Sequence, residues 1–288
     1  MKPLSDWPLA QRRNIIGIFT DIDDTLTTDG AISHDALQAL RDLKAAGLHV
    51  IAITGRPVGW CEQVAFDPKK AWPVDAVVAE NGSTALFLNE IPLLPGIYID
   101  QTLSKIYQEN STTRAGNFAR MQQVAQQVLR EVPGAMLSQD SGGRETDIAI
   151  DHSEFTNLSA EKQAQVVQIM QAHGLNATVS SIHINGWIGR HNKLVGARWT
   201  VRELFKRDLD REIDRWVYVG DSTNDALMFK HFAHSVGVAN IRRFEAELTH
   251  KPRYITQGER GAGFAEVVQA LLQALRQSPE SPAAMTAG

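Results

Sequence analysis

The sequence predicts an α/β fold in which an inserted α+β segment interrupts a parallel sheet. Short apolar strands alternate with amphipathic helices near both ends of the chain, as in parallel sheets covered by helices. The middle of the chain instead combines long helices with a strand that has one polar face. Polar clusters follow several apolar strands, where ligands bind in open parallel sheets. We therefore expect a Rossmann-like core that carries an inserted cap.

The first part of the chain alternates strands with a helix. Residues 15–20, 49–53 and 74–79 are short apolar runs, typical of strands buried on both faces. Between the first two runs, apolar residues recur at helical spacing. Ser33 is expected to cap the start of this helix and Gly47 to end it.

The middle of the chain has a different pattern, with longer helices and a strand that has one polar face. Residues 115–131 and 161–173 have the apolar stripe of amphipathic helices. Residues 146–150 are expected to form a strand. In 177–184, the second half alternates apolar and polar residues. Strands with one wet face indicate an antiparallel sheet, so this segment is expected to be an α+β insertion.

The α/β pattern then returns. Helices are expected at 194–205, from 226 and at 264–275, and strands at 216–219 and 235–239.

The expected domains follow from these patterns. Residues 1–84 and 188–288 would form the core, residues 85–187 the cap, and about 277–288 a disordered tail rich in Pro, Ser and Ala.

Composition and charge give no sign of a nucleic-acid-binding, disulfide-bonded or membrane-spanning protein. Of the 288 residues, 43% are hydrophobic and 22% are charged, as in soluble globular proteins. The net charge of −4 gives no electrostatic reason to expect nucleic acid or an anionic membrane as a partner. The single cysteine, Cys61, cannot form a disulfide within the chain. No apolar stretch suits a membrane span or a signal peptide, so a cytoplasmic location is expected.

Acidic residues follow two of the apolar strands. Asp21 and Asp23 come after the first strand, Thr54 after the second, and Asp221 and Asp225 after strand 216–219. The carboxyl ends of parallel strands share one edge of a sheet, so these residues are expected to converge. Crowded carboxylates repel unless a cation lies between them, and oxygen ligands without His or Cys suit Mg²⁺. Because Mg²⁺ bridges to phosphate, phosphate chemistry is expected.

A phosphate group also needs positive charge and N–H donors. The backbone amides of Thr54 and Gly55 are candidate donors. Lys193 precedes an expected helix and is a candidate counter-charge, although spacing alone does not distinguish it from Lys230.

The motifs resemble those of the haloacid dehalogenase-like phosphohydrolases. Residues 21–25 (DIDDT) resemble the DxDx[TV] loop, and 220–225 (GDSTND) resemble the GDxxND motif; Thr54 and Lys193 match the second and third motifs in order. The resemblance spans residues 15–275. The insertion, together with Glu80-Asn81-Gly82, is similar to the type IIB (Cof-like) subgroup, which includes sugar-phosphate phosphatases and phosphomannomutases.

The resemblance implies a role for each residue. Asp21 would attack phosphorus and form an aspartyl-phosphate, and Asp23 would act as general acid and base. Mg²⁺ would be held by the Asp21 carboxylate, the Asp23 backbone carbonyl and Asp221. The remaining assignments are phosphate binding by Thr54, Gly55, Lys193 and Asn224, and support of the site by Asp225.

Each residue also has a structural interpretation. Asp21 and Asp23 alone would suit a solvated turn, and Thr54 a hydroxyl bonded to backbone. Lys193 alone would suit the surface, and Asn224 and Asp225 would suit a helix cap. The order of the motifs favours the functional interpretation.

Cap residues are candidates for substrate specificity. Arg144 and Asp147 flank or lie on one expected strand, and His183 and Asn185 share the polar face of another. Such a set would suit sugar hydroxyls or a second acidic group. The alternative, that these residues are only the wet side of a sheet, stays open at this stage.

The sequence therefore predicts a Mg²⁺-dependent phosphomonoester hydrolase that acts on a small sugar phosphate. A phosphosugar mutase or phosphotransferase would share every core residue. A phospho-ligand sensor would not need an acid at Asp23, and a receiver domain has no place for the cap or for residues 220–225.

Overall fold

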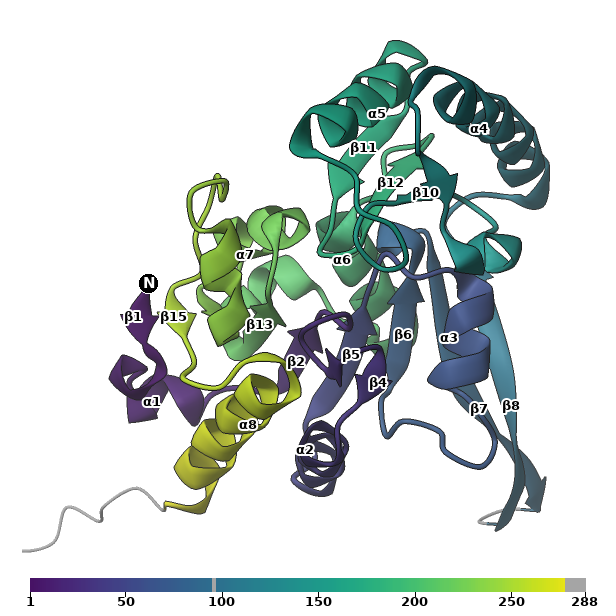
Figure 1. Ribbon diagram of the computed structural model, residues 1–288. Helices are drawn as coiled ribbons and strands as arrows, with labels where there is room; N and C mark the ends of the chain where they lie inside the picture. The colour runs from purple at the N-terminus through teal and green to yellow at the C-terminus, as the bar shows by residue number, and fades with distance from the viewer. Residues whose placement is uncertain (95–96, 278–288) are drawn as a thin grey trace, which may run out of the picture.

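The main sheet has nine strands, and its polar loops lie at one edge. The computed structural model describes residues 1–94 and 97–277, so most of the expected tail lies outside the described residues (Figure 1). The strand order is β1-β15-β14-β13-β2-β5-β6-β7-β8. In chain order, the strands are β1 (Lys2–Pro3), β2 (Gly17–Thr20), β5 (His49–Ile53), β6 (Ala76–Ala79), β7 (Thr84–Leu94), β8 (Ile97–Tyr107), β13 (Trp216–Gly220), β14 (His234–Gly237) and β15 (Tyr254–Ile255).

Neighbouring strands pair in parallel from β1 at one edge of the sheet as far as β6. Strand β7 pairs antiparallel with β6 and forms an antiparallel hairpin with β8. Residues 85–94 and 97–107, expected in the cap, therefore extend the core sheet instead. The physical reason lies in β7, where Ala85 and Leu86 are fully buried and pair with Val78 and Val77 of β6. An apolar strand with one open sheet edge beside it continues that sheet.

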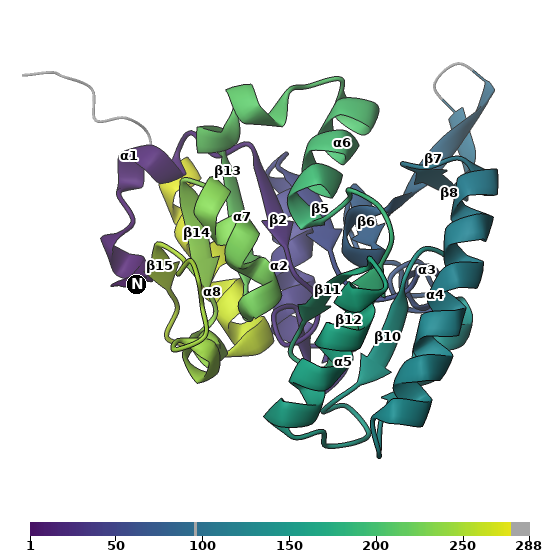
Figure 2. The same ribbon diagram turned by 90° about the horizontal axis from the view of Figure 1, so that it is seen from above.

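Helices cover both faces of the main sheet, as Figure 2 shows from above. One face carries α1 (Leu9–Arg12), α2 (His34–Ala45), α3 (Val58–Val64) and α8 (Arg260–Arg276), and the other carries α6 (Lys193–Phe205) and α7 (Ala226–His231). The residues expected to begin and end a helix, Ser33 and Gly47, are confirmed at α2. The Ser33 hydroxyl accepts from the Ala36 N–H at 3.2 Å, and Gly47 has a φ of +78° after the helix.

A second, four-stranded sheet lies above the carboxyl edge of the main sheet (Figure 1). Its antiparallel order is β11-β12-β10-β9, with strands β9 (Met136–Leu137), β10 (Ile148–Asp151), β11 (Asn176–Val179) and β12 (His183–Trp187). Helices α4 (Ser111–Glu131) and α5 (Ala160–Ala172) pack on it around a separate apolar core. We call this second unit, residues 108–191, the cap.

One sequence prediction is wrong within the cap. Residues 177–184 were expected to form a single strand, but they contain the end of β11, a turn and the start of β12. The turn is closed by Ser180, whose N–H donates to the His183 carbonyl at 2.8 Å. The Ser180 hydroxyl also accepts from the His183 N–H at 3.0 Å. Such local bonds of serine side chains compete with continuation of the strand.

Short elements complete the fold. A small hairpin of β3 (Thr27–Thr28) and β4 (Ala31–Ile32) follows β2. The 3-10 helices are η1 (Leu4–Asp6), η2 (Glu80–Gly82), η3 (Gln139–Gly143), η4 (Leu209–Arg211), η5 (Ile213–Arg215), η6 (Thr223–Asp225) and η7 (Ala239–Phe244). None of the helices in the described part of the chain has the length and apolar character needed to cross a membrane.

The two connections between core and cap meet at Gly82. The Gln108 side-chain amide donates to the Gly82 carbonyl at 2.7 Å where the chain enters the cap. Where the chain returns, the Asn192 carbonyl lies so close that a Cβ at position 82 would collide with it, and the φ of Gly82 is +110°. Only glycine suits this position without strain.

Candidate active site

Three carboxylates meet at the carboxyl edge of the main sheet. Asp21 follows β2 and Asp221 follows β13, and these strands are parallel neighbours. The Asp21 N–H donates to the Val219 carbonyl at 2.9 Å, so pairing of the two strands continues up to this residue. Carboxylate oxygens of Asp21, Asp221 and Asp225 lie within 4.8 Å of one another. Together with Lys193, they form what we call the strand-end cluster.

Lys193 links two of these carboxylates. Its ammonium group lies 2.6 Å from Asp21 Oδ1 and 2.7 Å from Asp225 Oδ1. The side chain is 3% exposed, at the first residue of α6. Burial alone would lower the pKa of Lys193, but the two carboxylates more than offset it and raise the pKa above its ordinary value. Lys193 therefore stays charged in the site.

Asp225 has a second role beside its ion pair. Its Oδ2 accepts from the N–H groups of Asp221 and Ser222 at 3.0 and 3.3 Å, and Tyr218 donates to its Oδ1 at 2.5 Å. It thus fixes the loop that carries Asp221 and orients Lys193. The helix-capping and functional interpretations of Asp225 are compatible.

Asp221 has the surroundings of a ligand for a divalent cation. Its side chain is buried, and it accepts weakly from the Thr25 hydroxyl at 3.5 Å and from the Asn240 amide at 3.2 Å. Burial, with Asp21 and Asp225 nearby, raises its pKa well above the ordinary value. Three carboxylates share one ammonium here, and an all-oxygen donor set of excess negative charge fits Mg²⁺.

The side chain of Asp23 faces a different partner. Both of its oxygens accept from Arg56 Nε at 3.0 Å, and Oδ1 also accepts from Nη2 at 2.9 Å. The Asp23 carboxylate is therefore not part of the strand-end cluster. Arg56 was missed in the sequence, although an arginine between a strand end and Pro57 was an available signal.

Arg56 connects the core with the cap. Its Nη1 donates to Asp140 at 3.1 Å, and its Nη2 donates to Glu154 at 2.7 Å. His183 Nε2 lies 2.8 Å from the same Glu154 carboxylate. His183, proposed from sequence as a cap residue of the site, is therefore linked to Asp23 through Glu154 and Arg56.

The loop that holds Thr54 and Gly55 contacts the cap directly. Thr54 is buried, and its hydroxyl accepts from the Arg56 N–H at 3.0 Å. The Gly55 carbonyl accepts from Arg144 Nη1 at 3.0 Å and from the Asn185 amide at 3.3 Å. The loop is thus held from both sides.

Arg144, Asp147 and Asn185 are joined to one another beside this loop. Arg144 donates to Asp147 at 2.7 Å, and so does Asn185 at 3.1 Å. All three side chains are buried, which contradicts the interpretation of this set as the wet side of a sheet. Burial raises the pKa of Asp147 to about 8, although Arg144 opposes the shift.

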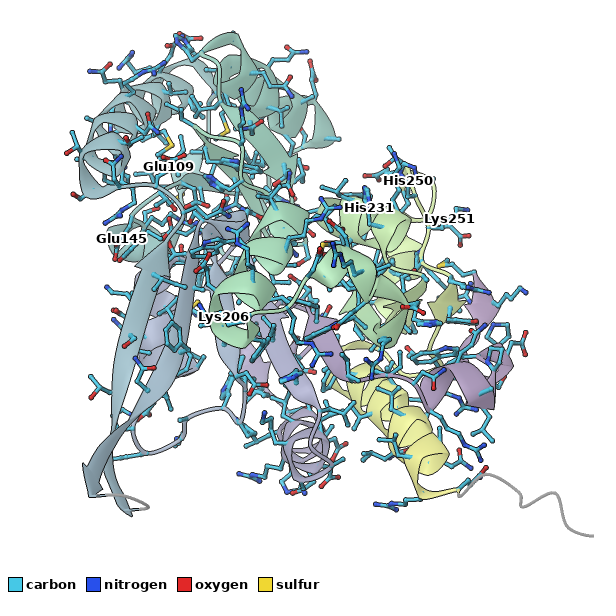
Figure 3. The ribbon with its side chains drawn as sticks, turned by 180° about the vertical axis from the view of Figure 1, so that it is seen from behind. Glu109, Glu145, Lys206, His231, His250 and Lys251 are labelled. Carbon is cyan, nitrogen blue, oxygen red and sulfur yellow. The ribbon has the colours of Figure 1, made fainter. Side chains whose placement is uncertain are left out.

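Glu80, which the sequence singled out as part of Glu80-Asn81-Gly82 but without a role, joins the core to the cap. It is fully buried at the end of β6 and accepts from the backbone N–H groups of Val58, Glu145, Thr146 and Asp147 at 2.5 to 3.2 Å. With Arg144, Asp147 and Asn185 it forms the junction cluster. Glu145 itself lies at the base of the cap (Figure 3), where Tyr107 of β8 donates to it at 2.8 Å.

A cleft of about 300 Å³ opens beside Lys193, between core and cap. Asn224 lines it, with its Oδ1 accepting from the Ser222 hydroxyl at 2.8 Å. The Thr223 hydroxyl donates to the Val179 carbonyl of β11 at 2.9 Å, so the same loop contacts the cap.

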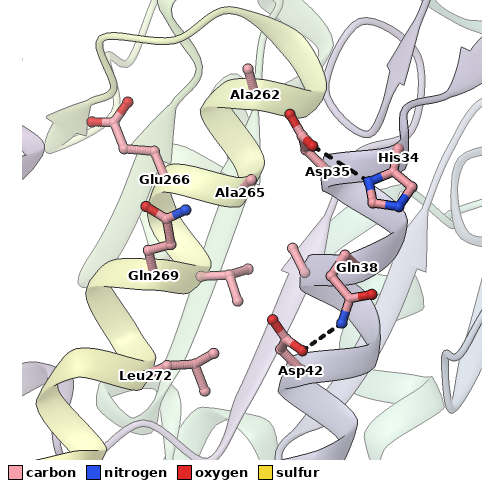
Figure 4. Close-up of a pocket in the computed structure, with 11 residues that line it drawn as sticks. His34, Asp35, Gln38, Asp42, Ala262, Ala265, Glu266, Gln269 and Leu272 are labelled. Atoms are coloured by element: carbon pink, nitrogen blue, oxygen red, sulfur yellow. Dashed lines mark hydrogen bonds and ion pairs between the residues drawn. The ribbon is translucent and has the colours of Figure 1, made fainter.

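Another groove, between α2 and α8, has a volume of about 270 Å³ (Figure 4). It is lined by surface residues such as Gln38, Asp42 and Gln269, and none of the residues that line it comes from the sequence motifs.

Comparisons with known proteins agree with this geometry. A family model described as haloacid dehalogenase-like hydrolase matches residues 18–112. A protein of Thermoplasma acidophilum is similar in structure, with a TM-score of 0.63 and 16% identity, over 90% of this chain and 98% of that one. A putative haloacid dehalogenase/Cof-like hydrolase of Plasmodium vivax has a TM-score of 0.64 and 15% identity, over 92% and 99%.

A third similar structure is the sucrose-phosphatase of Synechocystis in complex with sucrose and phosphate. It has a TM-score of 0.59 and 14% identity, over 90% of this chain and 98% of that one. Residues 18–112 thus match the model of the haloacid dehalogenase-like hydrolases, and about nine tenths of the chain is similar in fold to these solved structures.

Proposed function

We propose that the protein is a Mg²⁺-dependent phosphomonoester hydrolase that acts through an aspartyl-phosphate, with a small sugar phosphate as substrate. The observation that carries the proposal is the position of Lys193, which joins Asp21 to Asp225 beside Asp221. A buried carboxylate with a fixed ammonium partner suits a nucleophile that must meet a negative phosphoryl group.

The chemistry divides between two carboxylates. An Asp21 oxygen attacks phosphorus, and the bond from phosphorus to the alcohol oxygen breaks as Asp23 gives that oxygen a proton. Asp23 then takes a proton from the water that attacks the aspartyl-phosphate, which releases inorganic phosphate and restores Asp21. Lys193, the Thr54 hydroxyl and the Gly55 amide hold the phosphoryl oxygens, because the Thr54 N–H already donates to the Val78 carbonyl at 2.9 Å. Asn224 borders the cleft beside Lys193.

Mg²⁺ would be held by the carboxylates of Asp21 and Asp221 and by the Asp23 carbonyl, and would neutralise phosphoryl charge. Arg56 orients Asp23 for its proton transfers. The cap shields these steps from bulk water, and its Arg144, Asp147, His183 and Asn185 shape the space over the alcohol part. The sugar-phosphate assignment is supported by the fold that the chain shares with the sucrose-phosphatase.

The decisive experiment follows inorganic phosphate release from p-nitrophenyl phosphate and a panel of sugar phosphates. Wild-type protein is expected to be active with Mg²⁺ and inactive in excess EDTA. Asp21→Asn is expected to abolish turnover, whereas the exposed carboxylate change Asp210→Asn should leave it intact. Unchanged activity of Asp21→Asn would overturn the nucleophile assignment. Transfer of phosphate to a second sugar, instead of its release, would show a phosphotransferase.

A further inference from the structure

We propose that the cleft beside Lys193 selects substrates whose alcohol part is uncharged and rich in hydroxyl groups, and that the site rejects substrates with a second acidic group. This inference rests on the proposed phosphatase function and narrows the substrate at the same site. The sequence left both kinds of substrate open, and the charge pairing in the structure distinguishes them.

The lining of the cleft combines neutral polar side chains with apolar ones, which are Leu175, Ala177, Trp187 and Leu227. Its carboxamide side chains come from both core and cap: Asn81, Gln171, Asn176, Asn192 and Asn224. Carboxamides both donate and accept hydrogen bonds, as sugar hydroxyls do. Among the described residues that line the cleft, Lys193 alone is charged. A volume of about 300 Å³ lies at the lower end of the range for small-molecule sites.

Two polar atoms of this lining have no hydrogen-bond partner among the described residues. They are Asn81 Nδ2 and Thr178 Oγ1, both shielded from solvent. The Asn81 side chain is 2% exposed, and its backbone N–H is fixed on the Thr54 carbonyl at 2.9 Å. A buried donor without a partner costs about 1–3 kcal/mol, so a ligand oxygen that accepts from it would be bound favourably.

The cations around the site are already paired. Lys193 contacts two carboxylates, as described above. Arg56 contacts Asp23, Asp140 and Glu154, and Arg144 contacts Asp140 and Asp147. A second acidic group on the substrate would have to displace one of these partners in a buried environment, where an unpaired charge is costly.

Two carboxylates on the cap side, Asp140 and Glu154, remain ionised at neutral pH. Burial alone would raise the pKa of Asp140, but Arg144 and the Ser138 hydroxyl lower it to about 2. The pKa of Glu154 is also lowered, because His183 and Arg56 outweigh burial. These charges repel an anion that approaches Asp23.

The test compares two phosphate esters that differ only at one end. Glucitol 6-phosphate ends in a hydroxymethyl group, and 6-phosphogluconate carries a carboxylate at the same carbon. We expect kcat/KM to be at least about tenfold lower for 6-phosphogluconate, mainly through KM, since like charges oppose binding. Asp140→Asn should reduce the difference in kcat/KM between the two substrates several-fold, because it removes one repelling charge. Asp210→Asn, at an exposed arginine pair, should leave this difference unchanged.

A second pair of variants tests the cleft itself. Thr178→Val removes an unpartnered hydroxyl at nearly constant volume, and should raise the KM for glucitol 6-phosphate relative to p-nitrophenyl phosphate several-fold. Thr200→Val is the matched control, because the Thr200 hydroxyl is also buried without a partner among the described residues but lies on α6 outside the cleft. The control should not change the KM ratio.

Failure of the inference and failure of the proposed function give different results. Equal or better hydrolysis of 6-phosphogluconate by wild-type protein would overturn the inference alone, as would a KM ratio that Thr178→Val does not move. Absence of turnover on every phosphomonoester, including p-nitrophenyl phosphate with Mg²⁺, would overturn the proposed function, and the inference would fall with it.

Discussion

The strand-end cluster and the junction cluster are both buried and acidic, but they are built in opposite ways. In the strand-end cluster, three carboxylates share the single ammonium of Lys193. In the junction cluster, four backbone N–H groups surround the Glu80 carboxylate, and Asp147 has Arg144 and Asn185. The strand-end cluster leaves negative charge for a ligand to neutralise. In the junction cluster, the carboxylates of Glu80 and Asp147 find their hydrogen-bond donors within the protein. Stability and chemistry are thus separated within one interface.

The largest expected effect is on activity at the strand-end cluster. Lys193→Met should lower turnover of a phosphomonoester about 100- to 1,000-fold, because the phosphoryl group loses its fixed positive partner. Steady-state kinetics with saturating Mg²⁺ measures this. Lys230→Met, the alternative lysine from the sequence, should retain wild-type activity. If both variants behave alike, Lys193 has no special role.

The next effect is on stability at the junction cluster. Glu80→Ala should lower the free energy of unfolding by about 3–5 kcal/mol, because four backbone N–H groups lose their acceptor. Urea denaturation measures the change. Glu203→Ala, which removes a mostly exposed partner of Arg202, should change it by less than about 1 kcal/mol. Similar losses in the two variants would contradict the anchoring role of Glu80.

Arg56 links Asp23 of the core to Asp140 and Glu154 of the cap, so its substitution should affect activity more than stability. Arg56→Lys keeps the charge but cannot contact Asp23, Asp140 and Glu154 together, and kcat should fall about 10- to 100-fold. Arg207→Lys is the control, since Arg207 makes a similar two-pronged pair with Glu212 far from the motifs. A normal kcat for Arg56→Lys would show that Asp23 is positioned without it.

The smallest effect has the opposite sign. In EDTA, Asp221→Asn should raise the free energy of unfolding by about 1–2 kcal/mol, because it removes one of three crowded buried carboxylates. Thermal unfolding with and without Mg²⁺ measures this. The wild type should gain stability from Mg²⁺ and the variant should not. A destabilised Asp221→Asn protein in EDTA would mean that the strand-end cluster is not electrostatically crowded.

The sequence predicted the elements whose signals are local. The parallel sheet and the capping of the α2 N-terminus by Ser33 follow from patterns within a few residues. Asp21 and Asp221 were expected to meet because each ends a strand, and the structure brings their carboxylates together. Strand order and strand direction suffice for such an inference.

The junction cluster was not predictable in the same way. Glu80 finds its partners 22 to 67 positions away, and Arg56 finds Glu154 98 positions away. Periodicity carries no information on such pairs. The boundary of the cap was misplaced for a related reason. The sequence of β7 and β8 suits a strand in either sheet, and the free edge of β6 determines which sheet they join.

The contact at Gly82 has a consequence for how this architecture can change. Gln108 and Asn192, the residues that bound the cap, both contact that glycine. Joining two such points directly requires only a short loop, and a short loop has a low entropy of closure. Exchange of residues 109–191 for a different segment therefore needs little change in the path of the core chain, provided that the new segment supplies N–H donors for the buried Glu80.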